Sequence, residues 1–472
     1  MHLDDSAFLS ECKPTLRRLL SALTERFSYA SVLAADANCK SYHVSRSGVF
    51  CGEGTRFSGR GFVIRVHDGK GYAEYSFNEL SDGRIPGIVS LIAERLVPMG
   101  EGFPIDAFTA PPESPARLSA SAEVALHPAA LGDEKILSRL SKLREKILSE
   151  DERLVDATAY ASFREYHEYY LSDAREMEQN EIWTEGMIAA LALKDGEVKE
   201  YFDTVSGNGG IEILDGLEEK IPYVARSVVE LLTAEPIEPG EYDCIVAPDL
   251  SGMIAHEAFG HGVEMDMFVK DRALARSYIG QQIASPLVTM HDGGAAASQT
   301  ATFAFDNEGT PAGDTLVIDR GILVRGICDA LSARALGVEP TGNGRRESYK
   351  RKAYTRMTNT FFEGGTDSLE DMISSINYGF FLENPSSGME DPKNWGIQCI
   401  VNVAREIKDG KLTGRVFSPI ILSGYVPDLL KSISMMTPTV KLAGSGYCGK
   451  GYKEYVKVSD GGPYLKARIR LG

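Results

Sequence analysis

Two histidines five positions apart place the strictest demand on how this chain folds. His256 and His261 flank Glu257 in the pattern H-E-x-x-x-H, within a segment that reads SGMIAHEAFGHGVEMDM. In a regular α-helix, residues four apart differ by about 40° around the axis, whereas residues five apart differ by about 140°. Both imidazoles therefore face one partner only if the helix widens to an i→i+5 turn or breaks between them.

Glycines next to the second histidine permit either distortion. Gly260 and Gly262 flank His261 and relax the backbone there. Imidazole nitrogens are good zinc ligands, and a carboxylate beside such a metal can accept a proton from its water. The spacing alone leaves two interpretations open: a zinc site with Glu257 as general base, or two hydrogen-bonded histidines at a helix end.

A stretch rich in proline divides the chain. Residues 234–240 read AEPIEPG, and two prolines and a glycine cannot continue a preceding helix. Because 472 residues exceed one ordinary core, we expect an N-terminal domain over residues 1–235 and a C-terminal domain over residues 236–472. Strand hairpins occur in both halves without regular βαβ alternation. This predicts an α+β fold of two domains, each a mainly antiparallel β-sheet with packed helices, and places the metal-site helix in the C-terminal domain.

Apolar periodicity places the elements along the chain. Helical spacing marks residues 8–23, 85–97, 133–147 and 215–232, and Asp249 or Ser251 is the expected N-cap of the metal-site helix. Runs typical of strands occupy residues 29–35, 42–51, 61–66, 72–77, 154–160, 165–171, 182–193, 198–205 and 242–247. Residues 101–115 are expected to form a connector, because prolines and small residues are frequent there.

Charge and cysteine usage exclude several classes of protein. The net charge is −17, and residues 1–240 carry most of it, with 25 Lys and Arg against 40 Asp and Glu. An acidic surface repels phosphate backbones, so a nucleic acid partner is not expected. No run of 18 apolar residues appears, so no membrane span is expected either. Seven scattered cysteines without C-x-x-C pairs, and a start without signal-peptide character, indicate a cytoplasmic protein.

A series of motifs runs through the C-terminal half. In chain order they are YDCIVAPDLSGMIAHEAFGHGVEMD, ASPLVTMHDGG, FDNEGTP, TGNGRRESY, RMTN and GSGYCGKG. Together these motifs resemble the TldD/PmbA family of bacterial and archaeal metalloproteases. The likeness runs from Tyr242 to the C-terminus and is faint over the N-terminal half. In this family the TldD-type subunit carries H-E-x-x-x-H and the PmbA (TldE) sibling has lost it, so the resemblance implies a catalytic, TldD-type chain.

The same resemblance implies a ligand set for Zn²⁺. It assigns the metal to His256, His261 and Cys448, with Glu257 as general base. Three protein ligands leave the fourth tetrahedral position for water, as catalytic zinc requires. Cys448 lies in GSGYCGKG, where the glycines permit close approach of the backbone and Lys450 favours the thiolate.

Acidic residues just after the second histidine are candidates for supporting roles. Glu264 and Asp266 can accept hydrogen bonds from the histidine rings and orient them. Glu264 is also an alternative third ligand in place of Cys448. Asp266 is therefore a candidate for the orienting role, and Glu264 is a candidate for either role.

A basic cluster forms a second candidate region in this acidic chain. Its members are Arg345, Arg346, Lys350, Arg351, Lys352 and Arg356. A charge run is usually a solvated face. Arg345, Arg346 and Arg356 are nevertheless candidates to bind a peptide's C-terminal carboxylate or a developing oxyanion. The six other histidines lack metal-ligand spacing, and we expect them to be structural.

These features predict a cytoplasmic zinc metallopeptidase. The resemblance implies substrates that are short or unfolded polypeptides, such as leader peptides of modified microcins or labile antitoxins. It also implies a homodimer, or a heterodimer with a PmbA/TldE-type subunit, that encloses the site. The segment FDNEG departs from the family's usual DDEG at Asn307, so no role is carried over to that loop. The alternative is a non-catalytic peptide-binding or regulatory subunit that modulates a larger complex, which the intact motif argues against.

Overall fold

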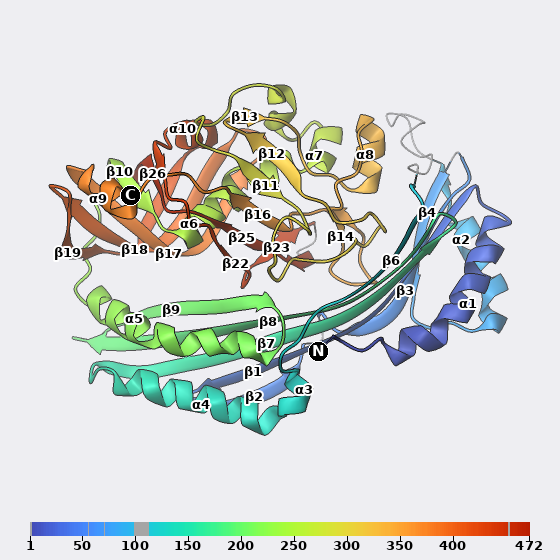
Figure 1. Ribbon diagram of the computed structural model, residues 1–472, viewed down its shortest axis with the longest axis horizontal. Helices are drawn as coiled ribbons and strands as arrows, with labels where there is room; N and C mark the ends of the chain where they lie inside the picture. The colour runs from blue at the N-terminus through green and yellow to red at the C-terminus, as the bar shows by residue number, and fades with distance from the viewer. Residues whose placement is uncertain (1, 55, 70, 99–112, 452–453) are drawn as a thin grey trace.

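The structure is a computed structural model that describes residues 2–54, 56–69, 71–98, 113–451 and 454–472. It confirms the predicted α+β fold with two domains. A long curved sheet from the N-terminal half carries helices on its outer face and supports the C-terminal half on its inner face (Figure 1). The connector predicted at residues 101–115 lies largely outside the described residues. The division at residue 235 stays a prediction.

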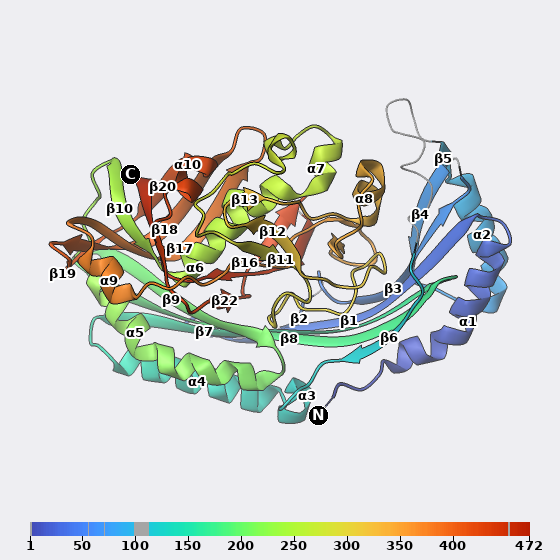
Figure 2. The ribbon, with the colours of Figure 1, turned by 45° about the horizontal axis from the view of Figure 1, so that its top comes forward.

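The N-terminal sheet has nine strands in the order β5-β4-β3-β1-β7-β8-β6, with β2 beside β1 and β9 beside β8. Among these described strands only β6 pairs in parallel, and it does so with β8. The strands are β1 Tyr29–Ser45, β2 Gly48–Glu53, β3 Gly59–His67, β4 Gly71–Phe77, β5 Val97–Pro98, β6 Ala116–Ser121, β7 Leu154–Ser172, β8 Arg175–Lys194 and β9 Glu197–Asn208. The 19 residues of β7 and the 20 of β8 form a platform beneath the C-terminal half (Figure 2).

Amphipathic helices bury one stripe each on the outer face of this sheet. They are α1 Ala7–Thr24, α2 Ile85–Glu94, α3 Pro128–Leu131, α4 Asp133–Ser149 and α5 Gly216–Leu231. In α4, for example, Ile136, Leu140 and Ile147 recur at helical spacing and are fully buried. The helices α4 and α5 cover one end of the sheet, and α1 and α2 cover the other (Figure 1).

Several predicted strands are longer than the sequence indicated. The separate runs at residues 154–160 and 165–171 belong to the single strand β7, and β1 continues through the polar residues after position 35. Both strands lie inside the sheet, where neighbours on each side satisfy their backbone groups whatever the side chains are. The helix predicted over residues 85–97 ends at Glu94, and β5 follows it.

The C-terminal half combines a ring of strands with a second sheet. The ring runs β10-β17-β18-β20-β26, and it closes because β10 also pairs with β26; β19 and β21 extend it. These strands are β10 Gly240–Val246, β17 Tyr378–Asp391, β18 Gly396–Lys408, β19 Lys411–Phe417, β20 Ile420–Tyr425, β21 Met435–Met436 and β26 Leu465–Leu471. The second sheet has the order β13-β12-β11-β16-β25-β22. It consists of β11 Met290–Asp292, β12 Thr315–Asp319, β13 Ile322–Leu323, β16 Asn359–Phe362, β22 Lys441–Ala443 and β25 Ser459–Gly462.

Two short hairpins and five α-helices are also found in the described part of this half. The hairpins pair β14 Gly344–Arg345 with β15 Tyr354–Thr355, and β23 Tyr447–Lys450 with β24 Glu454–Lys457. The helices are α6 Pro248–Met253, α7 Met265–Val269, α8 Ala330–Leu336, α9 Leu369–Ser374 and α10 Val426–Lys431. None of the helices in the described ranges has the length and apolar character that crossing a bilayer requires.

Buried polar contacts join the two halves. The loop FDNEG lies on the inner face of the N-terminal sheet, where the Gln179 side chain accepts from the backbone of Phe305 at 3.2 Å and donates to its carbonyl at 3.0 Å. The Asn307 amide donates to Glu168 at 2.7 Å. Arg346 reaches across to Glu74, with 2.9 Å between Nη1 and Oε1. The loop that departs from the family pattern is therefore an interdomain contact.

Candidate metal centre

A widened helical turn brings the two histidines together. Helix α6 continues into a π-helical segment, Ile254–Gly260, in which the backbone N–H of His261 donates to the carbonyl of His256. Of the two distortions that the sequence left open, the structure contains the i→i+5 turn. Ring centroids of His256 and His261 then lie 5.2 Å apart with an interplanar angle of 88°. A regular α-helix would point the second ring away.

The glycine before His261 is required by packing. A Cβ at Gly260 would lie 2.0 Å from the Met357 sulfur, far inside van der Waals contact.

The N-cap predicted for the metal-site helix, Asp249 or Ser251, is wrong, because Ala247 occupies that position and Pro248 begins the helix. Asp249 instead accepts hydrogen bonds from the backbone of Leu250 at 2.8 Å and of Asn384 at 2.9 Å. Its carboxylate therefore ties the helix to β17.

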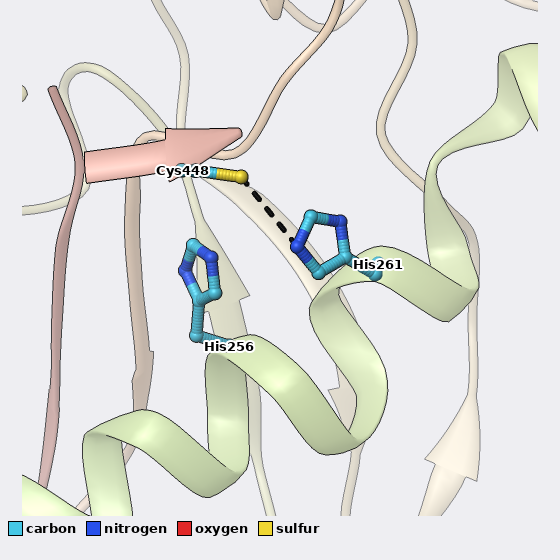
Figure 3. A group of neighbouring side chains, drawn as sticks. All are labelled: His256, His261 and Cys448. Atoms are coloured by element: carbon cyan, nitrogen blue, oxygen red, sulfur yellow. Dashed lines mark hydrogen bonds between the residues drawn. The ribbon is translucent and has the colours of Figure 1, made fainter. Parts of the chain in front are cut away.

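Cys448 arrives from a distant part of the chain. Strand β23 places its Sγ 3.5 Å from Nε2 of His261, and one ligand atom each from His256, His261 and Cys448 lie within 4.8 Å of one another (Figure 3). Such separations suit three ligands around one tetrahedral ion with metal–ligand bonds of about 2.0–2.3 Å. The buried Nδ1 of His256 has no hydrogen-bond partner among the described residues. The residues present therefore fit zinc.

Electrostatics keep the cysteine ready to bind a cation. Burial by itself would raise the pKa of Cys448, but the imidazoles of His261 and His256 outweigh it and hold that pKa well below the usual range of a thiol. A thiolate is the form that ligates metals. Two nitrogens and one sulfur make a donor set that zinc accepts readily.

Glu264 contacts the far side of the His261 ring. Its Oε2 lies 3.2 Å from Nδ1, while Nε2 faces Cys448. Lys450 donates to Glu264 at 3.0 Å and to Asp266 at 2.8 Å. Burial would raise the pKa of Glu264, but Lys450 and His261 lower it to about 2. This geometry favours the orienting role of Glu264 over its alternative role as third ligand.

Glu257 lies beside the cluster without belonging to it. Its Oε2 is 3.9 Å from Nε2 of His261, the same nitrogen that faces Cys448, and its side chain is 19% exposed. A Cβ at Gly388 of β17 would come within 2.6 Å of the Glu257 side chain. Close packing against β17 thus holds the Glu257 side chain beside the His261 ring.

A large cavity opens between the two halves next to this centre. It measures about 990 Å³ and is lined by Tyr160, Met187 and Thr204 from the N-terminal sheet and by Met253, Asn384 and Asp460 from the C-terminal half. Met253 is in the helix that leads into the histidine segment. Burial raises the pKa of Asp460 to about 6, and the nearby His256 opposes that shift. The cavity therefore lies beside the helix that leads into the candidate centre, and its lining includes none of His256, Glu257, His261 and Cys448.

The three candidate arginines have separate surroundings. Arg346 pairs with Glu74 across the interface, and the fully buried Arg356 donates to the carbonyls of Cys448 and Glu454. Arg345 donates to the Met357 carbonyl at 2.7 Å. Arg356 thus fixes the backbone at Cys448, and a substrate-binding role for the three arginines stays a prediction.

Sequence reasoning missed two carboxyl groups close to the centre, those of Asp460 and Glu390. Glu390 lies at the end of β17, and a Cβ at Gly262 would come within 2.8 Å of its Oε1. Burial raises the pKa of Glu390 well above its usual range, against the charge of His261. No spacing or motif could have indicated this residue, because β17 enters the site only through the fold.

Comparisons with known proteins agree with the motifs. The family described as PmbA/TldA metallopeptidase C-terminal domain matches residues 239–468. A metalloprotease TldD homolog of Buchnera aphidicola is 34% identical over 254 residues, which are 53% of this chain and 52% of that protein. A zinc metalloprotease TldD homolog of Saccharolobus solfataricus is 26% identical over 339 residues, 69% of this chain and 74% of the relative. The chain spans about half the length of the first of these relatives.

Solved structures share the fold over nearly the whole chain. TldE from Thermococcus kodakarensis has a TM-score of 0.76 at 17% identity and covers 97% of this chain and 100% of its own. A protein from Thermotoga maritima described as a putative modulator of a DNA gyrase has a TM-score of 0.77 at 16% identity, with 98% and 100% covered. At such identities these likenesses show the fold alone.

Proposed function

Because this chain belongs to the TldD/PmbA family, we propose that it is a TldD-type zinc metallopeptidase that hydrolyses short or unfolded peptides. One observation carries the proposal: His256, His261 and Cys448 converge within 4.8 Å although about 190 residues separate the cysteine from the histidines. The name of one relative, a zinc metalloprotease, supports the choice of metal.

The chain's own groups divide the reaction between them. When bound at this centre, zinc supplies Lewis acidity that activates water and polarises a peptide carbonyl. Glu257 accepts one proton from the attacking water as the carbon–oxygen bond forms. It then gives that proton to the leaving amine as the carbon–nitrogen bond breaks. Glu264 holds the His261 ring in place through Nδ1.

The interdomain cavity supports the substrate class. A space of about 990 Å³ next to the helix of the histidines admits an extended peptide and excludes a folded domain. We include leader peptides and labile antitoxins among the substrates to be tested. Dimerisation with a second copy or with a TldE-type subunit belongs to the same proposal, as does a cytoplasmic location, which the seven free cysteines suit.

Metal analysis and one substitution test this function. The purified protein is expected to hold one zinc ion per chain, and Glu257→Gln should keep the metal while cleavage of an unstructured fluorogenic peptide falls about 10²- to 10⁴-fold. The exposed Glu241→Gln is the matched control and should cleave like the parent. If Glu257→Gln cleaves as well as the parent, the mechanism is wrong. A parent that neither binds zinc nor cleaves would instead be the non-catalytic regulatory subunit.

A further inference from the structure

The two faces of the hairpin that contains Cys448 contact different parts of the molecule. Strands β23 and β24 pair Cys448 with Val456 and Tyr447 with Lys457. Neighbouring residues of a strand point to opposite sides, so Cys448 and Lys450 share the inner face with the histidines. Tyr447 and Lys457 share the outer face.

The outer face lies against the N-terminal sheet. The ring of Tyr447 stacks on Phe57, with centroids 5.2 Å apart and an interplanar angle of 15°. It also meets the edge of Trp183 on β8, at 6.3 Å and 72°. Its hydroxyl donates to Oε1 of Glu185 at 3.3 Å. The residue next to the candidate ligand therefore contacts three side chains of the N-terminal half on this side.

Lys457 strengthens the same contact. Its Nζ lies 4.0 Å from the centroid of Tyr447 and 4.7 Å from that of Trp183, and it forms an ion pair with Glu185. The two charged side chains are 2% and 7% exposed. A buried ammonium needs its carboxylate partner, because removing either charge leaves the other buried and unpaired.

A hairpin of this size does not fix its own position. In the described part of the chain β23 and β24 form a sheet of only two strands, and such a hairpin is marginally stable alone. From the inner side, Arg356 holds the carbonyls of Cys448 and Glu454. From the outer side, the described contacts include Phe57, Trp183 and Glu185, and Arg56 lies over the ring of Tyr455 at 4.9 Å from its centroid.

We propose that Trp183 and Glu185 of the N-terminal domain are positioning residues for Cys448, so that this domain sets the affinity of the metal centre without supplying a ligand. The inference rests on the proposed function, since it takes Cys448 as a zinc ligand. A thiolate must be held within about 0.5 Å of its productive position to bind well. Release of the outer face gives the hairpin freedom that the thiolate loses again when it binds zinc.

Metal affinity tests this inference in the full-length protein. Zinc is titrated in competition with a chromogenic chelator, and Co²⁺-loaded protein is examined for the sulfur-to-cobalt charge-transfer band that reports the Cys448 bond. Glu185→Gln should weaken zinc binding about 10- to 100-fold, the range for outer partners of metal ligands, and should reduce the cobalt band. Glu185→Asp should recover part of both, and Trp183→Phe should weaken binding severalfold.

The control breaks another interdomain ion pair. Glu230 of α5 pairs with Arg405 of β18 at 2.5 Å, away from the hairpin. Glu230→Gln should leave the zinc affinity and the cobalt band unchanged. If it weakens both as much as Glu185→Gln, or if Glu185→Gln and Trp183→Phe bind like the parent, the inference is overturned.

The same data separate this inference from the proposed function. A parent protein that binds Co²⁺ without a sulfur charge-transfer band would refute the role of Cys448, and with it both proposals. A parent that shows the band, together with a Glu185→Gln variant that is unchanged, would refute only the role of the N-terminal domain.

Discussion

Two places in this molecule bring a pair of histidines to one acidic group, and their surroundings differ. In the C-terminal half, His256 and His261 face the thiol of Cys448. On the N-terminal side, His127 and His167 both contact the carboxylate of Glu165, at 2.9 and 3.0 Å. Proximity of histidines alone would give both places the same function.

In the N-terminal pair, all four ring nitrogens of His127 and His167 have hydrogen-bond partners. His127 accepts from the backbone of Ala129 at 3.2 Å, and His167 lies 2.7 Å from the Asn180 side chain, so each ring has a protein partner on both sides. In the C-terminal pair, Nδ1 of His256 has no hydrogen-bond partner among the described residues. A thiol beside the rings, where the N-terminal pair has a carboxylate and an amide, distinguishes the candidate metal centre from a structural network.

The largest expected loss of zinc affinity comes from removing the sulfur of Cys448. Cys448→Ser replaces a soft thiolate by a neutral hydroxyl, and zinc affinity should fall by more than the 10–100-fold typical of outer partners, on the order of 10³-fold. Competition with a chelator measures it. His127→Gln in the other pair serves as control and should keep the zinc affinity of the parent. Equal loss in the two variants would erase the distinction between the pairs.

A smaller loss of zinc affinity is expected when Lys450, which pairs with the Glu264 carboxylate next to His261, is replaced. Lys450→Met removes the ammonium that holds Glu264 and Asp266 together, so zinc affinity should fall about 10- to 100-fold. Lys270 pairs with the same Asp266 at 3.2 Å but is 46% exposed, which makes Lys270→Met the matched control. The control is expected to bind zinc like the parent. A loss in Lys270→Met as large as that in Lys450→Met would point to general charge effects.

The N-terminal pair should respond to pH and not to metal. The hydrogen bond from His167 lowers the pKa of Glu165 below its usual 4.5. Burial opposes protonation of His167, but its bonds to Glu165 and Asn180 outweigh burial and raise its pKa above 6.5. The ion pair therefore stabilises the fold most between about pH 4.5 and 6.5, and its contribution is lost as the pH rises through the raised pKa of His167.

The substitution Glu165→Gln tests this predicted pH dependence of stability. The variant should lose about 1–2 kcal/mol of unfolding free energy at pH 6 and clearly less at pH 8.5, measured by urea denaturation, with unchanged zinc content. An equal loss at both pH values would mean that the carboxylate acts by packing and neutral hydrogen bonds rather than by charge.

The smallest change in stability is expected at His291, a half-buried histidine outside both pairs. His291 lies between Asp314 at 2.7 Å and Glu363 at 2.9 Å, whose side chains are 50% and 53% exposed. His291→Gln should change the unfolding free energy by at most about 0.5 kcal/mol, since exposed ion pairs contribute little, and should leave zinc binding unchanged. Any loss of zinc in His291→Gln would contradict the view that both His291 ring nitrogens bind only to the carboxylates of Asp314 and Glu363.

Local patterns predicted much of the fold. The stripe of α4 and the hairpin of β3 and β4 follow from apolar periodicity and a glycine turn, and the structure contains both. The long strands β1 and β7 were predicted in pieces. Their polar stretches break the pattern, yet two neighbouring strands hold the backbone extended there.

The motif and the family resemblance named the residues of the candidate centre. Spacing alone left open how His256 and His261 could face one ion. The π-helical turn decided it, and that turn depends on tertiary packing, since Gly260 lies against Met357. The role of Arg356 in holding Cys448 was not predicted, because its partner is a backbone carbonyl far along the chain.

The sequence by itself determined which side chains can do zinc chemistry and which segments are helical or extended, because donor atoms and apolar periodicity are local properties. Only the tertiary structure decided that Cys448 meets the histidines, that Glu390 lies beside them, and that the N-terminal sheet supports the hairpin of the cysteine. Those contacts join residues far apart in the chain. Their geometry follows from how two sheets pack, which no local pattern records.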